Sequence, residues 1–334
     1  MKGGEFIWRD GERVVFFGAD AAARTAEELP RHGFERYELL ASARALETAP
    51  AALREAAVGV HEVAAGAVNE LAAELIGSLP GAPLVALGGG RVIDTAKAIA
   101  AVQGAAVAAI PTTLSGAELT AIHKLPDGHS AERLVRPVLI FADPLAMTTL
   151  PDRLLRASAM NALAHGADSL YTPFSNPVSE LSALRGAELI ASALDGFTGP
   201  AARADLALGS LLSAHALDSA LFGLHHVICQ TLVRVMRVPH AETNAAILPW
   251  ALGALSPRAP AAFERLAAAL GTNPEGLPGR VEELGGGTRR LGELGARTEL
   301  LDTALDGMLA RDQLANTPDP PDRAELRAIV ESAW

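Results

Sequence analysis

The segment "LVALGGGRVIDTAK" (84–97) joins an apolar strand to a helix through three consecutive glycines. Gly88, Gly89 and Gly90 have no Cβ, so the backbone of this turn can approach a ligand closely. The helix that follows offers unpaired N–H groups and the positive end of its dipole, which suits a pyrophosphate. Asp94 and Lys97 fall in its first two turns. The spacing fits neither G-x-G-x-x-G nor a P-loop, so the turn alone leaves a phosphate site and a plain tight turn open.

The first half of the chain alternates short strands and helices around this turn. We expect strands at 13–18, 36–42, 83–90, 105–113 and 137–144, and a short strand near 58–60 inside an otherwise helical 49–81 stretch. From residue 150 onward helical segments follow one another at 151–171, 176–195, 200–219, 221–235, 241–255, 259–270, 277–284, 297–311 and 322–333. The pattern predicts an α/β domain with a Rossmann-like parallel sheet over 1–148 and an all-α domain over 149–334.

The bulk composition excludes several function classes. The net charge is −11 and no long basic run occurs, so nucleic acid and anionic membranes are poor candidate partners. No signal peptide and no membrane span are expected. Cys229 is the only cysteine, which fits a reducing, cytoplasmic setting.

Several motifs together carry a family resemblance. G-G-G-x-x-x-D-x-x-K at the glycine turn is followed by "IPTTLSGAELT" (110–120), "SAMNALAHGADSLY" (158–171) and "GLHHVICQTLVRVMRVPHAE" (223–242), and the tail at 315–334 agrees as well. This order resembles the iron-containing (group III) alcohol dehydrogenase family, with its dehydroquinate synthase-like fold. N-A-x-x-H, "GLHH" and "PHAE" are closest to its maleylacetate reductase branch.

The resemblance implies a nicotinamide cofactor, NAD(H) or NADP(H), and a homodimer. The residues that it assigns to the cofactor are Gly88, Gly89, Gly90, Asp94, Lys97, Thr112, Thr113 and Ser115. The expected strand "RYELLAS" ends without the acidic residue that commonly binds the ribose 2′-OH of NAD, so NADP(H) stays open.

The resemblance also implies a divalent metal. Positions 161, 165, 226 and 240 match the aspartate and three histidines that hold iron or zinc in the related alcohol dehydrogenases. Asn161 and His165 are four residues apart on one helix face, and Pro239 can supply the bend that brings His240 towards His226. Three imidazoles and one oxygen suit Fe²⁺ or Zn²⁺, although an amide is a poorer ligand than a carboxylate. Without metal, the imidazoles can still hydrogen-bond and protonate an enolate or alkoxide oxygen.

Four further features bear on the chemistry. His225 is either a group on the substrate side or a packed helix histidine. Gln230 stands where the family carries a further histidine, and glutamine cannot shuttle a proton near neutral pH. Arg234 is either a carboxylate-binding residue or a surface arginine. His215 lies with Asp218 on the helical stripe that leads to His226, either in a pocket or on a solvated face.

We therefore expect catalytic roles for His165, His225, His226 and His240. The predicted function is NAD(P)H-dependent hydride transfer to a small, unsaturated or keto carboxylate. One alternative is a metal-dependent alcohol dehydrogenase that acts on another small alcohol or aldehyde. The other is a relative diverted to dehydratase- or cyclase-type chemistry, suggested by Gln230 and by Arg91, which follows the glycines.

Overall fold

A computed structural model describes residues 6–196, 199–287 and 290–334 of this chain. The chain divides into two compact units, Met1–Thr149 and Leu150–Trp334.

The first unit is built on a seven-stranded sheet. Its strands are β1 (Phe6–Asp10), β2 (Arg13–Phe17), β3 (Tyr37–Ala41), β4 (Ala57–Glu62), β5 (Leu84–Gly88), β6 (Val107–Pro111) and β7 (Leu139–Ala142). They are ordered β1-β2-β7-β6-β5-β3-β4. β1 and β2 form an antiparallel hairpin, and all other neighbours are parallel. Parallel neighbours need crossover connections, and helices supply most of them.

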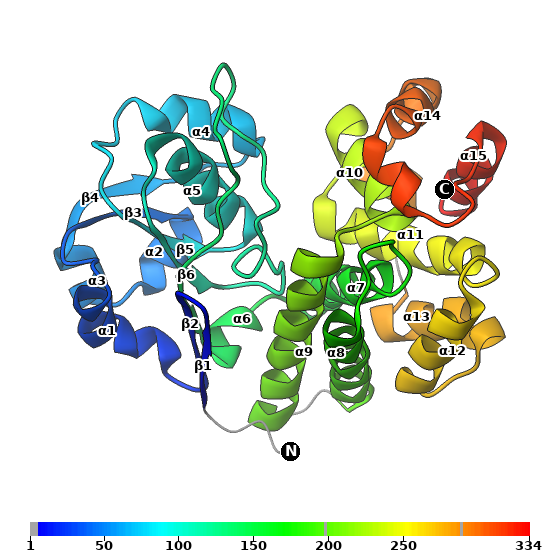
Figure 1. The fold of residues 1–334 in the computed structure, drawn as a ribbon, viewed down its shortest axis with the longest axis horizontal. Helices are drawn as coiled ribbons and strands as arrows, with labels where there is room; N and C mark the ends of the chain where they lie inside the picture. The colour runs from blue at the N-terminus through cyan, green and yellow to red at the C-terminus, as the bar shows by residue number, and fades with distance from the viewer. Residues whose placement is uncertain (1–5, 197–198, 288–289) are drawn as a thin grey trace. The chain divides into compact units, whose positions relative to one another are not determined.

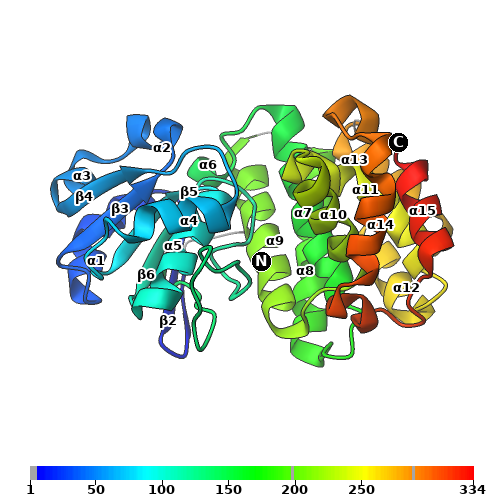
Figure 2. The same ribbon diagram turned by 90° about the horizontal axis from the view of Figure 1, so that it is seen from above.

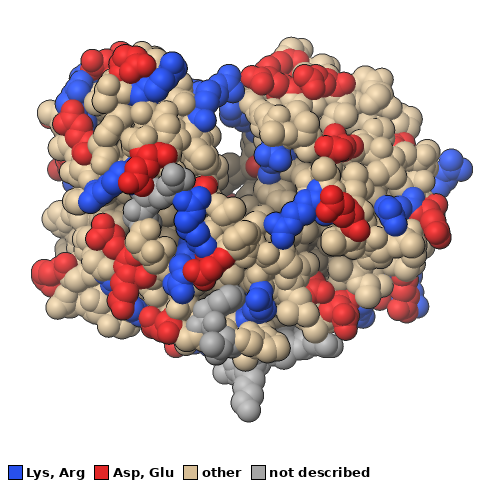
Figure 3. Space-filling model, turned by 180° about the vertical axis from the view of Figure 1, so that it is seen from behind, with Lys and Arg blue, Asp and Glu red and all other residues tan. Residues whose placement is uncertain are grey.

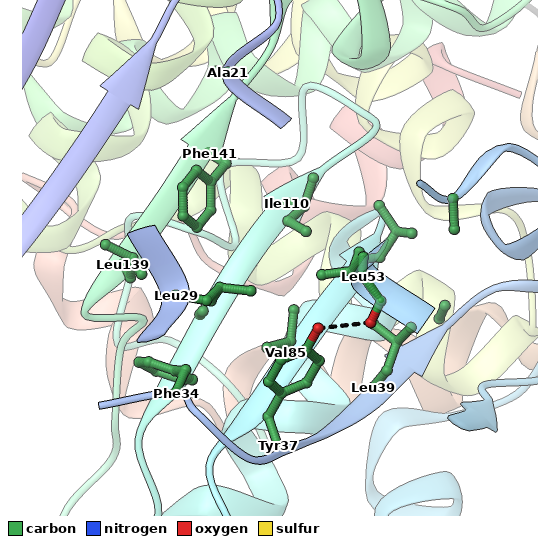
Figure 4. Close-up of a cluster of buried hydrophobic side chains, with 14 of the residues drawn as sticks. Ala21, Leu29, Phe34, Tyr37, Leu39, Leu53, Val85, Ile110, Leu139 and Phe141 are labelled. Carbon is green, nitrogen blue, oxygen red and sulfur yellow. Dashed lines mark hydrogen bonds between the residues drawn. The ribbon is translucent and has the colours of Figure 1, made fainter. Parts of the chain in front are cut away.

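Six helices accompany this sheet: α1 (Thr25–Arg31), α2 (Ala43–Thr48), α3 (Ala51–Glu55), α4 (Val68–Ile76), α5 (Gly90–Gln103) and α6 (Pro144–Met147). Alternate strand residues such as Leu39, Val85 and Ile110 face one core, together with Leu29 and Phe34 from the α1 region (Figure 4). All of these side chains are almost fully buried, which at about 25 cal/mol per Å² makes the apolar core the main stabilising term. Tyr37 also donates its hydroxyl to the Leu53 carbonyl, 2.6 Å away.

The second unit is helical, and no strand occurs among its described residues. Its helices are α7 (Asp152–Ser169), α8 (Pro177–Asp195), α9 (Gly199–Ala220), α10 (Leu224–Met236), α11 (His240–Leu255), α12 (Pro260–Ala269), α13 (Leu277–Gly285), α14 (Leu301–Leu309) and α15 (Arg323–Ser332). α7, α8 and α9 lie side by side (Figures 1 and 2).

Helix α7 is the centre of this unit. Every residue from Ala157 to Ser169 is buried, as expected for a helix covered on all sides by α8, α9 and α11. Small residues let its neighbours pack closely. A Cβ placed on Gly186 of α8 would lie 2.8 Å from the carbonyl oxygen of Gly209 on α9. Polar side chains on α7 are thereby held in a rigid and dry environment.

The predicted fold class is confirmed, and so is the short strand expected near 58–60, which is β4 between two short helices. Two details of the sequence prediction are wrong. β1 was not expected. His215 and His226 share no helical stripe, because Leu221 adopts φ 60° and the chain bends by 98° between α9 and α10. The half-buried His215 and Asp218 therefore lie on a different helix from His226.

Two further properties concern the length of the apolar helices and the charge of the surface. No single helix among the described residues is long and apolar enough to span a membrane; α9 and α10 pass that test only as a bent pair. On the face drawn in Figure 3, basic and acidic side chains are interspersed.

Candidate active site

The three glycines at the end of β5 pack directly against the loop that follows β6. A Cβ on Gly89 would lie 3.0 Å from Cγ2 of Thr113, and a Cβ on Gly90 would lie 2.9 Å from Cβ of Ser115. Gly88 has φ 158°, and its carbonyl accepts from the Thr112 N–H at 3.0 Å. The residues that the resemblance assigned to a cofactor therefore meet at one place in the first unit.

This turn has the features of an anion site. α5 begins at Gly90 and its first N–H groups face no side-chain cap. The Thr113 hydroxyl is buried and has no hydrogen-bond partner. A backbone cradle that a Cβ would fill, with an unused hydroxyl beside it, fits the phosphates of a nicotinamide dinucleotide.

Lys97 joins helix α5 to the loop that follows β6. Its side chain is fully buried, and its Nζ donates to Asp94 Oδ1 at 2.7 Å and to the carbonyls of Ala117 and Ile122 at 3.0 Å. All three ammonium protons are thereby used. Lys97 thus fastens the 115–122 loop to α5, whereas Asp94 is partly exposed.

Glu118 in the same loop was missed by the sequence analysis. Its side chain is fully buried, and neither carboxyl oxygen has a hydrogen-bond partner. Burial raises the pKa of Glu118 to about 7, although the nearby Lys97 charge opposes the shift.

In the second unit, three of the predicted histidines lie together: His165 on α7, and His225 and His226 on α10. The rings of His165 and His226 are stacked, with centroids 4.9 Å apart. Burial, then the charges of His226 and His240, lower the pKa of His165 well below its usual value. Burial, then His240 and Arg311, lower the pKa of His226 to about 3. These imidazoles are therefore neutral at physiological pH.

Asp168 fixes the orientation of His226. Its Oδ2 accepts from His226 Nδ1 at 2.8 Å and from the backbone N–H groups of Gly223 and His226 at 3.3 Å. Its Oδ1 accepts from the Tyr171 hydroxyl. The carboxylate of α7 thus caps the N-terminus of α10. A Cβ on Gly223 would lie 2.7 Å from the Tyr171 oxygen, which explains the glycine of "GLHH".

This arrangement assigns the protons on the two stacked rings. His226 donates from Nδ1, so its Nε2, which is buried and unpartnered, carries a lone pair. His165 Nδ1 is also buried without a partner, and the His165 ring makes no hydrogen bond within the described chain. A neutral His165 therefore keeps one N–H to donate and one lone pair to accept.

The third histidine, His225, packs against His226. Its ring lies edge-on to His226, and its Nε2 contacts Asn244 Oδ1 at 2.9 Å. Asn244 in turn donates to the His240 carbonyl at 2.7 Å, which ties α10 to the start of α11. Burial lowers the pKa of His225 to about 3. These contacts are those of a packed helix histidine, whereas His225 Nδ1 is buried without a hydrogen-bond partner.

The predicted metal ligands do not form a converged site. Asn161 lies one turn before His165 on α7, and its buried Oδ1 has no hydrogen-bond partner. Yet no three His, Cys, Asp or Glu side chains in the described part of the chain are placed to hold an ion. The nearest carboxylate, Asp168, is used by four donors behind His226. A neutral donor set without carboxylate does not fit a tightly held divalent cation, and we derive no step through one.

The position of Gln230 brings in an arginine that the sequence did not indicate. Arg311 donates from Nη2 to Gln230 Oε1 at 2.7 Å, although 81 residues separate them. Arg234, which lies on α10 together with Gln230, is exposed at the surface.

Comparison with known proteins fits this geometry. The family model for iron-containing alcohol dehydrogenases matches residues 13–144, and the model for the C-terminal part of that family matches residues 156–334. The chain belongs to the iron-containing alcohol dehydrogenase family.

Its relatives include several maleylacetate reductases. The chain is 38% identical to the enzyme of Burkholderia cepacia over 75% of this chain and 73% of that one, and 31% identical to maleylacetate reductase 1 of Rhodococcus opacus over 99% and 96%. The crystal structure of maleylacetate reductase from Rhizobium sp. strain MTP-10005 superposes with a TM-score of 0.84 at 26% identity, covering 99% of this chain and 98% of that one. This chain is an oxidoreductase of that family.

Proposed function

We propose that this protein is an NAD(P)H-dependent reductase of maleylacetate or of a closely similar unsaturated keto dicarboxylate. The stacked pair of His165 and His226, each with a buried ring nitrogen that has no hydrogen-bond partner, is the observation that carries the proposal. Its relatives are named for reduction of that substrate.

The glycine turn would hold the dinucleotide, through Gly88, Gly89, Gly90, Thr112, Thr113 and Ser115. The cradle and the unused Thr113 hydroxyl support this assignment. When bound, a reduced nicotinamide supplies a hydride, which carries two electrons and one proton to a carbon conjugated with the carbonyl. The carbonyl oxygen then holds the negative charge of an enolate.

The imidazoles would act on that oxygen. A free N–H of His165 donates to it as the charge develops, and low-dielectric surroundings strengthen such a bond. His226, held by Asp168, and His240 would complete the group of imidazoles. This group transfers the proton that neutralises the enolate. Placing one good donor and proton-transfer group is worth about 10²–10⁴-fold in rate.

A metal is a separate proposal. Iron or zinc held by Asn161, His165, His226 and His240 would be weakly bound, because no carboxylate balances its charge. We also propose a homodimer in the cytoplasm, on the family resemblance and on the single, buried Cys229.

The decisive experiment follows the oxidation of NADH and of NADPH with and without maleylacetate. We expect consumption of one equivalent of reduced cofactor per equivalent of substrate. His226→Ala should abolish it, while Trp250→Phe in α11 serves as a control substitution. If neither cofactor binds the wild-type protein, the proposal is wrong. Binding without turnover of maleylacetate would instead point to another substrate of this family.

A further inference from the structure

Arg311 is an arginine whose charge is left uncompensated. It lies between α14 and the short helix η5 (Asp312–Asn316), directly before the first residue of η5. Its side chain is partly buried, and its only hydrogen bond within the described chain is the one to Gln230. Neither Arg311 nor Arg234 forms an ion pair with a described carboxylate. Partly buried charges are normally paired, because removing them from water is costly.

The surroundings hold this guanidinium beside the imidazoles. Its Cζ lies 5.7 Å from the centroid of the Phe222 ring, and that ring lies 5.8 Å from the His226 ring. Asn316 of η5 donates to the Phe222 carbonyl at 2.8 Å, which anchors the segment there. Arg311 thus stands one aromatic ring away from His226.

Gln230 orients the guanidinium without neutralising it. A carboxylate or a neutral histidine at this position would satisfy or displace the arginine, whereas an amide oxygen takes one N–H and leaves the full charge. Four of the five N–H groups of Arg311 remain available. A planar fork of this kind matches a carboxylate in a two-point contact.

We propose that Arg311, oriented by Gln230, is the anchor for a carboxylate group of the substrate. The proposal rests on the function proposed above, since it assigns a residue to recognition of the acid end of that substrate. It explains together the replacement of the family histidine by Gln230 and the unpaired arginine that contacts it.

The test uses binding as well as turnover. Maleate, an unreactive dicarboxylate, and maleamide, its neutral diamide, are titrated into the full-length wild-type protein by calorimetry. We expect maleate to bind and Arg311→Met to weaken it by about tenfold to a hundredfold, the usual effect of removing one partner of a charge pair. Weak maleamide binding should be the same in both proteins. Arg311→Lys should recover part of the affinity, because it keeps the charge without the fork.

Gln230→Glu is the sharper variant. It gives Arg311 a carboxylate inside the protein, so it should weaken maleate binding as much as Arg311→Met does while preserving the fold. Arg265→Gln, which removes one charge of a surface ion pair with Glu180, is the matched control and should change nothing. With maleylacetate as substrate, Arg311→Met should raise KM far more than it lowers kcat.

The outcomes separate this proposal from the function. Loss of maleate binding in Arg311→Met and Gln230→Glu supports the anchor even if wild-type protein fails to turn over maleylacetate. The anchor is overturned if maleate binds both variants as tightly as wild type, or if it does not bind the wild type at all.

Discussion

Asp168 Oδ2 lies 2.8 Å from Nδ1 of His226, and both side chains are almost completely buried. The carboxylate comes from α7 and the imidazole from α10, so one contact both caps a helix and selects a tautomer. Second-sphere carboxylates of this kind commonly set the orientation and basicity of a functional histidine.

Replacing Asp168 by Asn should therefore disable His226 without removing it. The amide can present an N–H to Nδ1, which would leave the proton on Nε2 and exchange the acceptor for a donor. We expect kcat/KM for the reductase reaction to fall by about 10–100-fold, with dinucleotide binding unchanged. Steady-state kinetics measure kcat/KM, and cofactor fluorescence measures dinucleotide binding.

Tyr171→Phe is the matched control for that change. It removes one of the four hydrogen bonds to Asp168 and leaves the charge and the contact with His226 intact. Its effect on kcat/KM should be clearly smaller. Equal losses in both variants would mean that general destabilisation, and not the tautomer, explains the result.

Glu118 predicts a pH-dependent stability in the first unit. Its folded pKa of about 7 exceeds the ordinary value of 4.5, because burial disfavours the charged form. A raised folded pKa contributes stability that is full below about pH 4.5 and is lost as the pH rises through 7. Glu118→Gln should remove this loss and stabilise the protein at pH 8 by about 3 kcal/mol, with little difference at pH 5.

Denaturant unfolding of both proteins at the two pH values measures this difference. Comparing variant with wild type cancels the buried histidines, whose lowered pKa values act in the opposite direction between about pH 3 and 6.5. A variant with the same relative stability at pH 5 and pH 8 would contradict the prediction.

The fold could be read from sequence because local patterns determine it. The apolar run before Gly88 and the helical start after Gly90 signal a strand, a turn and a helix without any long-range information. β4 was underestimated because its sequence, "AVGVHE", is only half buried and lies between two helices of at most nine residues. β1 was missed although Phe6, Ile7 and Trp8 are residues that strands prefer, because the segment is only five residues long and forms an edge strand that pairs with β2 alone.

The site was only partly predictable, because its polar contacts join distant segments. His165 and His226 could be found because the motifs around them, N-A-x-x-H and "GLHH", resemble those of the family. The link between Gln230 and Arg311 spans 81 residues and leaves no local signal. The burial of Lys97 depends likewise on hydrogen bonds to carbonyl groups 20 and 25 residues away. Sequence alone therefore could not show whether Lys97 binds a cofactor or holds a loop in place.

Gly90→Ala tests the cradle of the glycine turn. Gly90 has an ordinary helical conformation, so the added methyl costs little except its 2.9 Å approach to Cβ of Ser115. We expect about 1–3 kcal/mol of destabilisation from this overpacking, together with weaker dinucleotide binding. Adding Ser115→Gly should recover the stability. Gly77→Ala, where a Cβ meets nothing within 4 Å, is the control and should be close to neutral.

Asn161→Asp tests whether charge is what limits metal binding. Asn161 is buried one turn before His165 on α7, and its Oδ1 has no hydrogen-bond partner. An aspartate there adds an anionic ligand of similar size to three neutral imidazoles, a set that suits Fe²⁺ or Zn²⁺. We expect purified wild-type protein to retain little metal after dialysis against a weak chelator. The variant should retain close to one equivalent, measured by elemental analysis.

The control is His165→Ala in the Asn161→Asp background, which should return the metal content to the wild-type level. Retention of a full equivalent by the wild type would show instead that the amide is sufficient and that the imidazoles converge on an ion when one is supplied.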